Sequence, residues 1–510
     1  MKILLVYQAF ENLGVEYLSA ALRREGHDTA LLFDPALYND AFLHKPFLAK
    51  MLSYQRDLVS TARDWKPDLI AFSVVSPTLR WALDLAKLLK EATGAPVLFG
   101  GLHPTAAPDQ TLAHPQVDFV GVGEGEIIVT KLAEVIGNGG SIGDVPNLVW
   151  RENDNIVHNP LAPFMDVDDM PWPDKGLFHK AAPYTRFGYT IVAGRGCHMR
   201  CNFCCNSFAA YLSADGDVGF HRKRRVDDVI NELVDRKARY GFDHVRWYDD
   251  CLTYDRDWFQ QLTDRYTEEV AVPYWCFSNP DQLDEPVVKQ LERTGCYELQ
   301  MGVQTIYEST RRKVLNRRES TEHIRKAIAL FKGTNISLAV DNILNIPGQT
   351  EEEIIDMVRF YTENRPDRVN AYWLTYFPGT KIIPIAEHAG ALSESDIKKL
   401  YEDPDFPAMQ INRPPGRKDL HRLHNYVLFT LLIPKNWHKV IQERRLYRFF
   451  PTLDPMMLLG IIYRLFSVRQ FAHLEKRIFR RYFHFGVHRV LSALGLRKPL
   501  PVAERKSGEL

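Results

Sequence analysis

Four of the chain's seven cysteines lie within nine positions of the sequence GRGCHMRCNFCCN, residues 194–206. Three of them, Cys197, Cys201 and Cys204, have the spacing C-x3-C-x2-C, and Cys205 follows directly. Soft thiolates this close together suit a zinc ion or an iron–sulfur cluster. The sequence therefore predicts a metal centre on this loop.

The spacing favours an iron–sulfur cluster over the common alternatives. Zinc sites usually pair one C-x2-C with a second, whereas the other cysteines here are scattered singly at positions 251, 276 and 296. The bacterial ferredoxin run C-x2-C-x2-C-x3-C-P does not occur in this loop. Three ligands would leave one iron of a [4Fe–4S] cluster open, as a catalytic zinc keeps an open position. Glycines at positions 194 and 196 would let the loop fold tightly round such a cluster.

The composition is that of a large globular protein. The chain has 510 residues, 45% hydrophobic and 25% charged, and this length predicts about three domains. Lys+Arg and Asp+Glu balance at 64 each, so the net charge indicates no class of partner. The start MKILLVYQAFENLG predicts a β-strand rather than a signal peptide. Because the sequence contains no run of eighteen apolar residues, no transmembrane helix is expected. Clustered thiols then favour a reducing, cytoplasmic location over a disulfide framework.

Residues 1–150 alternate short apolar runs with helical patterns, which predicts an open, doubly wound parallel α/β sheet with helices on both faces. The predicted strands are 2–7, 29–34, 68–75, 96–101 and 118–126. Ligands of such sheets bind beyond the carboxyl ends of the strands. Four polar or glycine-rich loops follow these ends, and they are either a ligand-binding edge or ordinary βα turns.

Three stretches of this domain, ENLGVEYLSAALRREGH, VLFGGLHPTAAPD and VDFVGVGEGE, resemble the Rossmann-like cobalamin-binding domain of cobalamin-dependent radical SAM enzymes. The resemblance covers most of residues 1–140. The D-x-H-x-x-G motif, whose His ligates cobalt in classical cobalamin mutases, does not occur here, so His103 is either an axial ligand or a structural residue of its turn. The cobalamin contacts that the resemblance implies are Gln8, Asn12, Leu13, Gly14, Ser73, Val75, Ser76, Gly100, Gly101, His103, Gly123, Glu124, Gly125 and Glu126.

Residues 197–204, CHMRCNFC, reproduce C-x3-C-x-aromatic-C, the signature of the radical SAM superfamily. LNIPGQTEEEI and YFPGTKI resemble further landmarks of its cobalamin-dependent branch, so the resemblance covers about residues 1–390. It implies that Cys197, Cys201 and Cys204 hold a [4Fe–4S] cluster, that S-adenosylmethionine (SAM) binds the open iron, and that Phe203 lies near the adenine. Cys205 falls outside the signature and is expected to be a small buried thiol.

Residues 151–185, rich in Pro, Asp and aromatics, are predicted to be a linker between two domains. Six βα units in residues 186–390 then resemble the partial (β/α)6 TIM-type barrel of the family. Their predicted strands are 190–194, 244–250, 274–279, 296–305, 336–350 and 368–380. The site of such a barrel lies at the carboxyl ends of its strands.

SAM contacts are therefore expected at these strand ends. For Asp249 and Asp250 an alternative interpretation is that they cap the next helix. Two positions depart from the family pattern, because Gln304 replaces the acid of G-V-E-S and Asn279 opens a stretch that often begins with Arg. The expected SAM contacts, besides Phe203, are Asp249, Ser278, Asn279, Gly302, Gln304 and Asn345.

The resemblance implies reductive cleavage of SAM to a 5′-deoxyadenosyl radical, with an electron from a flavodoxin- or ferredoxin-type donor. The expected outcome is methylation of an unactivated carbon of a small molecule through methylcobalamin. Two alternatives remain: a radical cyclase or rearrangement enzyme of the same architecture, and a non-catalytic iron–sulfur or zinc protein. The cobalamin edge is expected to face the barrel mouth, because such a radical needs a dry pocket between the domains.

Residues 391–510 are predicted to form a helical, basic C-terminal domain. Between residues 435 and 498, fourteen Lys and Arg residues oppose three acids, a net charge of +11. Interleaved aromatics indicate either peripheral contact with the inner membrane surface, which would favour an apolar or lipid-like substrate, or a helical cap over the substrate pocket. No nucleic-acid recognition motif accompanies the charges, so nucleic acid is not an expected partner. The last ten residues, PVAERKSGEL, are expected to be disordered.

Overall fold

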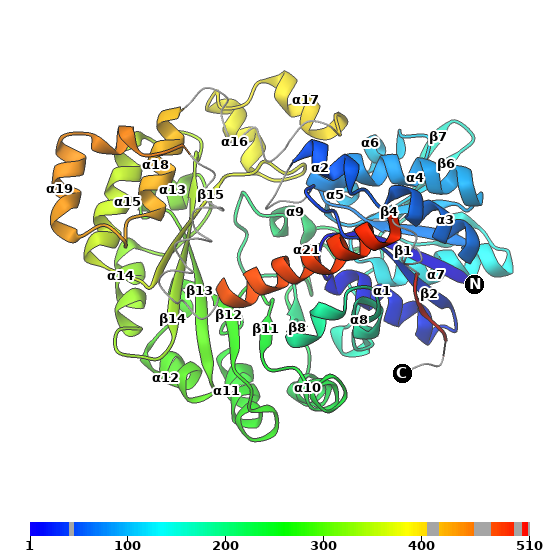
Figure 1. Cartoon of the computed structure of the whole chain (residues 1–510), viewed down its shortest axis with the longest axis horizontal. Helices are drawn as coiled ribbons and strands as arrows, with labels where there is room; N and C mark the ends of the chain where they lie inside the picture. The colour runs from blue at the N-terminus through cyan, green and yellow to red at the C-terminus, as the bar shows by residue number, and fades with distance from the viewer. Residues whose placement is uncertain (40–44, 405–417, 453–470, 494–501, 508–510) are drawn as a thin grey trace.

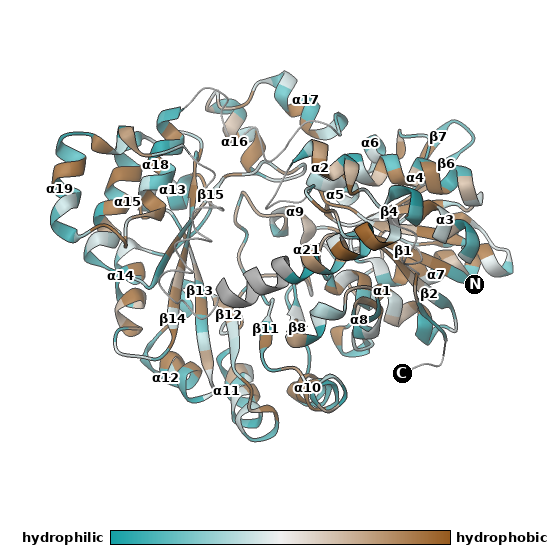
Figure 2. Cartoon of the chain, viewed as in Figure 1, coloured by the Kyte–Doolittle hydropathy of each residue, from teal (hydrophilic) through white to brown (hydrophobic). Residues whose placement is uncertain are grey.

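Two sheets form the centre of the computed structural model, which describes residues 1–39, 45–404, 418–452, 471–493 and 502–507. One sheet lies in the N-terminal third, blue to cyan in Figure 1, and the other in the middle of the chain, green to yellow. Hydrophobic residues run along the strands of both, as Figure 2 shows. Within the described ranges, no helix combines the length and the apolar character needed to span a membrane.

The first sheet has eight strands in the order β16-β2-β1-β3-β4-β5-β6-β7. The order reverses between β1 and β3, and open α/β sheets bind their ligands at such a reversal. The central strands are buried along most of their length because helices cover both faces. The five parallel strands, which match the predicted ones, are β1 Lys2–Gln8, β2 Asp28–Asp34, β3 Leu69–Ser73, β4 Val97–Gly100 and β5 Phe119–Gly121.

Helices α1 and α7 pack together on one face of this sheet, and α3 and α4 pack together on the other. Helix α1 begins where the Asn12 side chain accepts a hydrogen bond from the Val15 amide at 2.9 Å, the usual N-cap arrangement. The helices of this part are α1 Leu13–Arg24, α2 Pro46–Met51, α3 Gln55–Trp65, α4 Leu79–Thr93, α5 Leu102–Ala106, α6 Pro108–Leu112 and α7 Gly125–Asn138.

Antiparallel strands extend this sheet at both edges. β6 Leu148–Glu152 and β7 Asn155–His158 form a hairpin, so the sheet continues into the segment predicted as linker. The predicted disorder of the last ten residues is wrong for β16 Ala503–Arg505, which pairs with β2. Arg505 also donates to Asp174 at 3.0 Å, so a buried ion pair as well as main-chain pairing fixes this strand.

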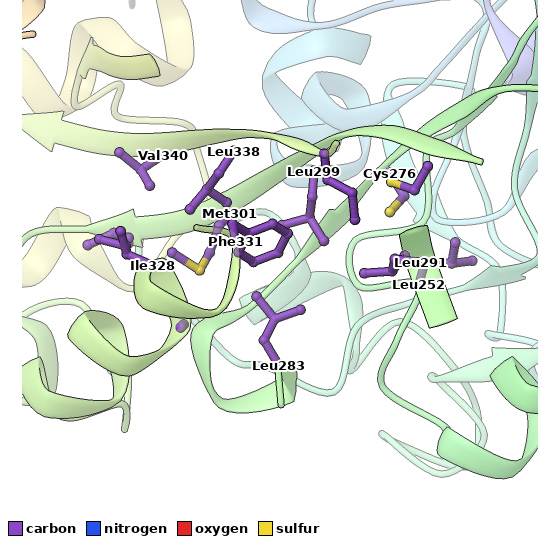
Figure 3. Packing of buried hydrophobic residues seen from close by; sticks show 14 of the residues in the cluster. Leu252, Cys276, Leu283, Leu291, Leu299, Met301, Ile328, Phe331, Leu338 and Val340 are labelled. Carbon is purple, nitrogen blue, oxygen red and sulfur yellow. The ribbon is translucent and has the colours of Figure 1, made fainter. Parts of the chain in front are cut away.

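The second sheet has six parallel strands in the order β15-β14-β13-β12-β11-β8 and stays open between β15 and β8, a partial barrel. Cys276, Met301 and Val340 point to the helix side of the strands and pack in one hydrophobic cluster (Figure 3). The strands, which match the six predicted βα units, are β8 Tyr189–Ile191, β11 Val245–Trp247, β12 Tyr274–Ser278, β13 Cys296–Gln304, β14 Ser337–Leu344 and β15 Arg368–Trp373.

The helices around the barrel follow its strands in chain order. One further helix, α8 Lys175–Ala181, precedes β8 and packs against α1 and β2 of the first sheet. The barrel helices are α9 Asn206–Ala209, α10 Val226–Tyr240, α11 Arg256–Arg265, α12 Glu285–Arg293, α13 Glu308–Lys313, α14 Thr321–Leu330, α15 Glu351–Glu363, α16 Ile382–His388 and α17 Glu394–Glu402.

The described C-terminal helices pack on both halves of the molecule. α18 Lys418–Leu428 and α19 Lys435–Glu443 lie against α15 of the barrel. α21 Phe471–Ala493, red in Figure 1, instead runs toward the N-terminal half, where Phe485 is buried in the core of the first sheet. Its ring centroid is 5.8 Å from that of Phe33. Residues 453–470 of the predicted basic C-terminal domain lie outside the described residues.

Replacing Phe485 with Ala should therefore destabilise the N-terminal half. A buried Phe→Ala change costs about 3–5 kcal/mol because it removes apolar contacts and leaves a cavity. The matched control is Phe483→Ala on the same helix, since Phe483 is 64% exposed and its loss should cost little. Urea unfolding followed by circular dichroism measures both changes, and equal losses would show that α21 is not part of this core.

Candidate functional site

The cysteine loop, residues 194–206, leaves the carboxyl end of β8 and is fastened across the barrel mouth. The Asn202 amide donates to the Leu315 carbonyl at 3.0 Å, and the Asn202 side chain donates to the Val314 carbonyl at 2.9 Å. The Asn316 side chain donates to the Arg200 carbonyl at 2.7 Å. Segment 314–316 follows β13 and α13, so a loop from the middle of the six-stranded sheet holds the loop that leaves its edge strand.

A short two-stranded ribbon shapes the start of the cysteine loop. β9 Gly194–Arg195 pairs antiparallel with β10 Arg222–Lys223. A Cβ at Gly194 would lie 2.2 Å from the Arg222 carbonyl oxygen, and one at Gly196 would lie 2.1 Å from that of Phe220. Gly196 also has φ +76°, a conformation that side chains disfavour. Both glycines are needed here for the close return of the chain, and their role in folding the loop round a cluster stays a prediction.

The three signature thiols lie on the inner side of this loop. Cys197 and Cys201 are buried and Cys204 is half-buried. The Met199 amide points at the Cys197 sulfur at 3.4 Å, and hydrogen bonds to cluster sulfurs are one means by which proteins tune such centres. Among the residues with described positions, no three His, Cys, Asp or Glu side chains are arranged to hold a single metal ion.

The thiols carry their protons in the protein without metal. Burial raises the pKa of Cys197, and it raises the pKa of Cys201 to about 11 although the Arg317 guanidinium acts in the opposite direction. The pKa of Cys204 is also raised, first by its hydrogen bond with Cys205 and then by burial. Metal binding needs thiolates, so loading of this loop would release protons.

Arg317 is a residue of this site that the sequence patterns do not reveal. Its guanidinium, 4% exposed, contacts the Cys201 sulfur at 3.7 Å and donates to the Gly302 carbonyl at 2.8 Å. It also donates to the Asn279 side-chain oxygen at 3.3 Å and pairs with the buried carboxylate of Glu319. The cysteine loop and the ends of β12 and β13 therefore share one buried cation.

Asp249 fixes the cysteine loop rather than capping a helix. One of its oxygens accepts from the Ala193 amide at 2.8 Å, and the other pairs with Lys223 at 2.8 Å. The N-cap of the following helix α11 is Asp255. Asp250 accepts from Asn206 at 2.7 Å, so neither acid follows the capping alternative.

The remaining expected SAM contacts lie at or near the strand ends, but their side chains point in different directions. Gln304 and Asn345 end β13 and β14 with φ of +68° and +62°, and such strained residues cluster at functional sites. Phe203 packs against the small hydrophobic cluster formed after β14 and β15. Ser278 is 2% exposed and shares a 2.7 Å hydrogen bond with Thr253, on the outer side of the sheet.

The carboxyl edge of the first sheet borders a cleft of about 330 Å³ that also reaches the cysteine loop. Val192 and Arg195 of the barrel line one side, which confirms that this edge faces the barrel mouth. Gly101 has φ +99°, and a Cβ there would lie 2.7 Å from the Val74 carbonyl oxygen. Predicted cobalamin contacts that line the cleft are Leu13, Gly14, Ser73, Gly100, Gly101, Gly123, Glu124, Gly125 and Glu126.

The five other predicted cobalamin contacts have different surroundings. Asn12 caps α1, and the Val75 amide donates to the Thr78 hydroxyl in a turn. His103 is 3% exposed, shares a 2.9 Å hydrogen bond with Ser76, and has a pKa lowered to about 4 by burial. Gln8 lines a second cavity of about 800 Å³ on the same edge.

The glycine wall of the cleft fits a large flat ligand. With backbone rather than side chains facing the space, a macrocycle can approach the strand ends closely. The buried Oε2 of Glu124, which lines the cleft, has no hydrogen-bond partner in the described residues. The three thiols of the signature lie on the cysteine loop, two of them buried and one half-buried, and their role as cluster ligands stays a prediction.

Two ion pairs, here called the seam pairs, join residues 123–126, the GEGE loop, to the two-stranded ribbon at the start of the cysteine loop. Glu126 binds Arg195, and Glu124 binds Arg222 of the opposite ribbon strand. Arg195 also approaches Glu124 at 3.4 Å. Burial alone would raise the pKa of Glu126, but the Arg195 guanidinium outweighs it and the pKa is lowered. Glu126 is therefore committed to Arg195, whereas only one oxygen of Glu124 makes a hydrogen bond to an arginine.

A second ionic cluster lies buried between the halves. The Lys175 ammonium, 0% exposed, pairs with Glu16 at 2.7 Å and Glu11 at 3.2 Å. Glu11 also pairs with Arg246 of β11 at 3.3 Å. The cluster connects the loop after β1, helix α8 and the barrel.

Neutralising Glu126 should weaken the contact between the halves in a pH-dependent way. Glu126→Gln should cost about 2 kcal/mol at neutral pH, as expected for a hydrogen bond to a charged group. Because the folded pKa is lowered, the stabilisation is present above the ordinary value of 4.5 and is lost as the pH falls through the folded pKa. Thermal unfolding at a series of pH values should show the variant and wild type converging in acid; a constant difference would contradict the assignment.

Comparison with known proteins agrees with this two-part arrangement. The family profile described as B12 binding domain matches residues 3–133, and the profile of the Radical SAM superfamily matches residues 191–361. Among curated proteins, the chain is 27% identical over 366 residues to cytidylyl-2-hydroxyethylphosphonate methyltransferase of Streptomyces wedmorensis, covering 62% of this chain and 65% of that one. It is 23% identical over 390 residues to anaerobic magnesium-protoporphyrin IX monomethyl ester cyclase of Cereibacter sphaeroides, covering 71% and 58%.

These alignments span less than two thirds of each relative's own length. Among solved structures, the cobalamin-dependent SAM radical enzyme OxsB, with aqua-cobalamin and SAM bound, has the same fold, with a TM-score of 0.63 and 13% identity over 97% of this chain and 80% of that one. The two profile matches together cover more than half of the chain and fall on the two halves of the site. The chain belongs to the cobalamin-dependent radical SAM enzymes.

Proposed function

We propose that this enzyme methylates an unactivated carbon of a small molecule, using SAM, a [4Fe–4S] cluster and cobalamin. The observation that carries the proposal is a pair of adjoining cavities: Val192 and Arg195 line both the glycine-walled cleft of the first sheet and the cavity beside Cys197. A methyl donor on one side and a radical source on the other could then act on one substrate. An electron donor of low potential, of the flavodoxin or ferredoxin type, is part of the proposal.

The residues have distinct proposed roles. Cys197, Cys201 and Cys204 hold the cluster, and Cys205 is not a ligand. When bound, the cluster and SAM supply a 5′-deoxyadenosyl radical, and cobalamin supplies the methyl group. Arg317 and Asp249 position the cysteine loop through the contacts described above. The residues proposed to contact SAM are Phe203, Asn279, Gly302, Gln304 and Asn345; Ser278 would act only through Thr253.

The protein's own contribution is to orient the substrate and the cofactors and to exclude water from the space between them. The seam pairs and the buried cluster around Lys175 hold the two halves together at two places. A closed space protects a reactive carbon radical from solvent and from the wrong side chains. The burial of His103 and its bond to Ser76 favour the structural reading of that residue over axial ligation of cobalt.

A second candidate function is radical cyclisation. It is supported by the similarity over 71% of this chain to a relative named as a cyclase. The architecture is common to both outcomes, so methyl transfer must be tested on the product itself.

The experiment is incubation of the anaerobically reconstituted protein with methyl-deuterated SAM and dithionite. We expect 5′-deoxyadenosine, and a deuterated methyl group in the product once a substrate is supplied. Cys197→Ala, Cys201→Ala and Cys204→Ala should each reduce 5′-deoxyadenosine to background, because each removes a cluster ligand. Cys205→Ala is the matched control and should retain the cluster and the cleavage.

Mass spectrometry of nucleoside and product gives the answer. A product without the deuterated methyl group would favour cyclisation. If protein with a fully loaded cluster did not cleave SAM, the proposed radical mechanism would be wrong. Loss of the cluster in Cys205→Ala would overturn the ligand assignment.

We also propose that α21 contacts an anionic membrane surface. Phe483, Val487 and Val490 are 64%, 42% and 54% exposed, and their spacing puts them on one face of the helix. With Phe187 of the neighbouring turn, Phe483 and Val487 line an apolar cavity of about 450 Å³. Arg480 beside this cavity, and the net charge of +11 over residues 435–498, complement anionic lipid headgroups.

Replacing Phe483, Val487 and Val490 together with Asp should abolish flotation with liposomes that contain phosphatidylglycerol. Each buried apolar side chain is worth about 1.5–3 kcal/mol, and the new acids would be repelled by the lipid. Ile156→Asp on the far edge strand β7, a residue 42% exposed, is the control and should float like wild type. Equal flotation of wild type and the triple variant would refute the contact.

A further inference from the structure

The strands of the barrel present different residues to their two sides. In β12, Tyr274, Cys276 and Ser278 are buried toward the helices, while Trp275 and Phe277 between them are only half-buried. Successive side chains of a strand point to opposite faces, so Trp275 and Phe277 point into the barrel. Figure 3 shows the opposite face of the same sheet, where Cys276 packs among the helix-side residues.

Tyr248 joins these two residues to form a wall of three rings, here called the aromatic wall. The ring centroids of Tyr248 and Trp275 are 5.3 Å apart, and those of Trp275 and Phe277 are 4.9 Å apart at 85°. Tyr248 and Phe277 are 6.1 Å apart. Tyr248 is 47% exposed, and none of the three belongs to a hydrophobic core cluster of the described residues.

The aromatic wall begins beside the cysteine loop. Tyr248 lines a cavity of about 200 Å³ together with Cys197 and Val192, and Val192 also lines the glycine-walled cleft. Asp249, the next residue, holds the cysteine loop through the Ala193 amide. The wall is thus a part of the barrel interior that adjoins both halves of the proposed site.

Deeper in the barrel the carboxylates lie beside polar partners. The Asp341 carboxylate accepts from Gln300 at 2.7 Å and from Asn370 at 2.8 Å. Glu298 Oε1 and Arg368 form a buried ion pair at 2.7 Å, while Glu298 Oε2 has no hydrogen-bond partner in the described residues. Each carboxylate thus has a polar partner, and the surface that the wall itself offers to a ligand is aromatic.

We propose that the aromatic wall binds the substrate, and that this substrate is an apolar molecule with a ring body. Ring faces offer broad, rigid, polarisable surfaces that pack on flat conjugated or saturated rings, and they give a negatively charged group nothing to pair with. The inference rests on the proposed function, because it places the carbon to be modified between the cysteine loop and the glycine-walled edge. Tyr248, Trp275 and Phe277 would then determine specificity.

Binding to the anaerobically reconstituted protein, without dithionite, tests the proposal separately from turnover. Three probes distinguish the sources of the ligand chemistry: octaethylporphyrin as a conjugated ring without charged groups, a saturated pentacyclic triterpene as an aliphatic ring system, and CMP as a polar, charged molecule. Porphyrin binding is followed by its absorbance and fluorescence, and the other two are tested as competitors.

We expect porphyrin to bind, the triterpene to compete and CMP not to compete. Trp275→Ala and Phe277→Ala should each weaken porphyrin binding about tenfold, while Trp275→Phe should retain most of it. Trp437→Ala, at an exposed Trp on α19, is the matched control and should bind like wild type. Thermal unfolding of each variant verifies that the barrel is intact.

Equal binding of porphyrin by wild type and both wall variants would overturn the proposal. Competition by CMP alone, or a failure of both apolar probes to bind, would overturn it as well. Because wild-type protein is assayed in parallel for SAM cleavage with dithionite, the two proposals fail in different ways. Cleavage without wall-dependent binding overturns only the substrate class, and binding without cleavage overturns the proposed function.

Discussion

Buried charges between the two halves set the geometry of the site. In the seam pairs, Glu126 is 6% and Arg195 17% exposed as side chains, so separating them would leave charges in surroundings with little water. In the second cluster, Lys175 balances Glu11 and Glu16 only when the loop after β1 and helix α8 are both in place. Breaking such a pair is strongly unfavourable, even though the pair itself adds little to stability. Apolar packing would tolerate sliding of one half over the other, whereas a reaction that brings a radical and a methyl group to one carbon depends on a fixed arrangement.

The parts of the molecule that can be predicted from the sequence have local signals. The strands of both sheets are short apolar runs between helical patterns, and the cysteine spacing and the glycines of the edge are visible directly. The contacts of Arg317 and the seam pairs leave no such trace, because Arg317 meets Cys201 only after the chain has passed round the barrel. β16 lacks a signal for a related reason: three residues carry almost no propensity, and pairing with β2 decides their conformation.

The alternation of side-chain directions along a strand explains one further difference between the expected and the observed site. Neighbouring residues at a strand end point to opposite sides, so the expected SAM contacts Ser278 and Asn279 cannot both face the mouth. Asn279 reaches Arg317, and Ser278 turns outward to Thr253. The same alternation places the two rings of the wall that β12 supplies inside the barrel. The sequence YWCFSN itself carries this pattern, because its second and fourth residues are aromatic and share one face of the strand.

Gln304 stands where the resemblance to the family places an acid, and the positive charge nearest to it is already opposed. Arg317 pairs with Glu319 and lies against Cys201, so its one positive charge is opposed by a carboxylate before any thiol is ionised. The Gln304 side chain lies close to Gly302, the carbonyl of which Arg317 binds. A neutral amide keeps hydrogen-bonding capacity at this strand end without adding a charge. The backbone of Gln304 is left-handed, with φ +68°, at the point where the register of β13 against β14 shifts.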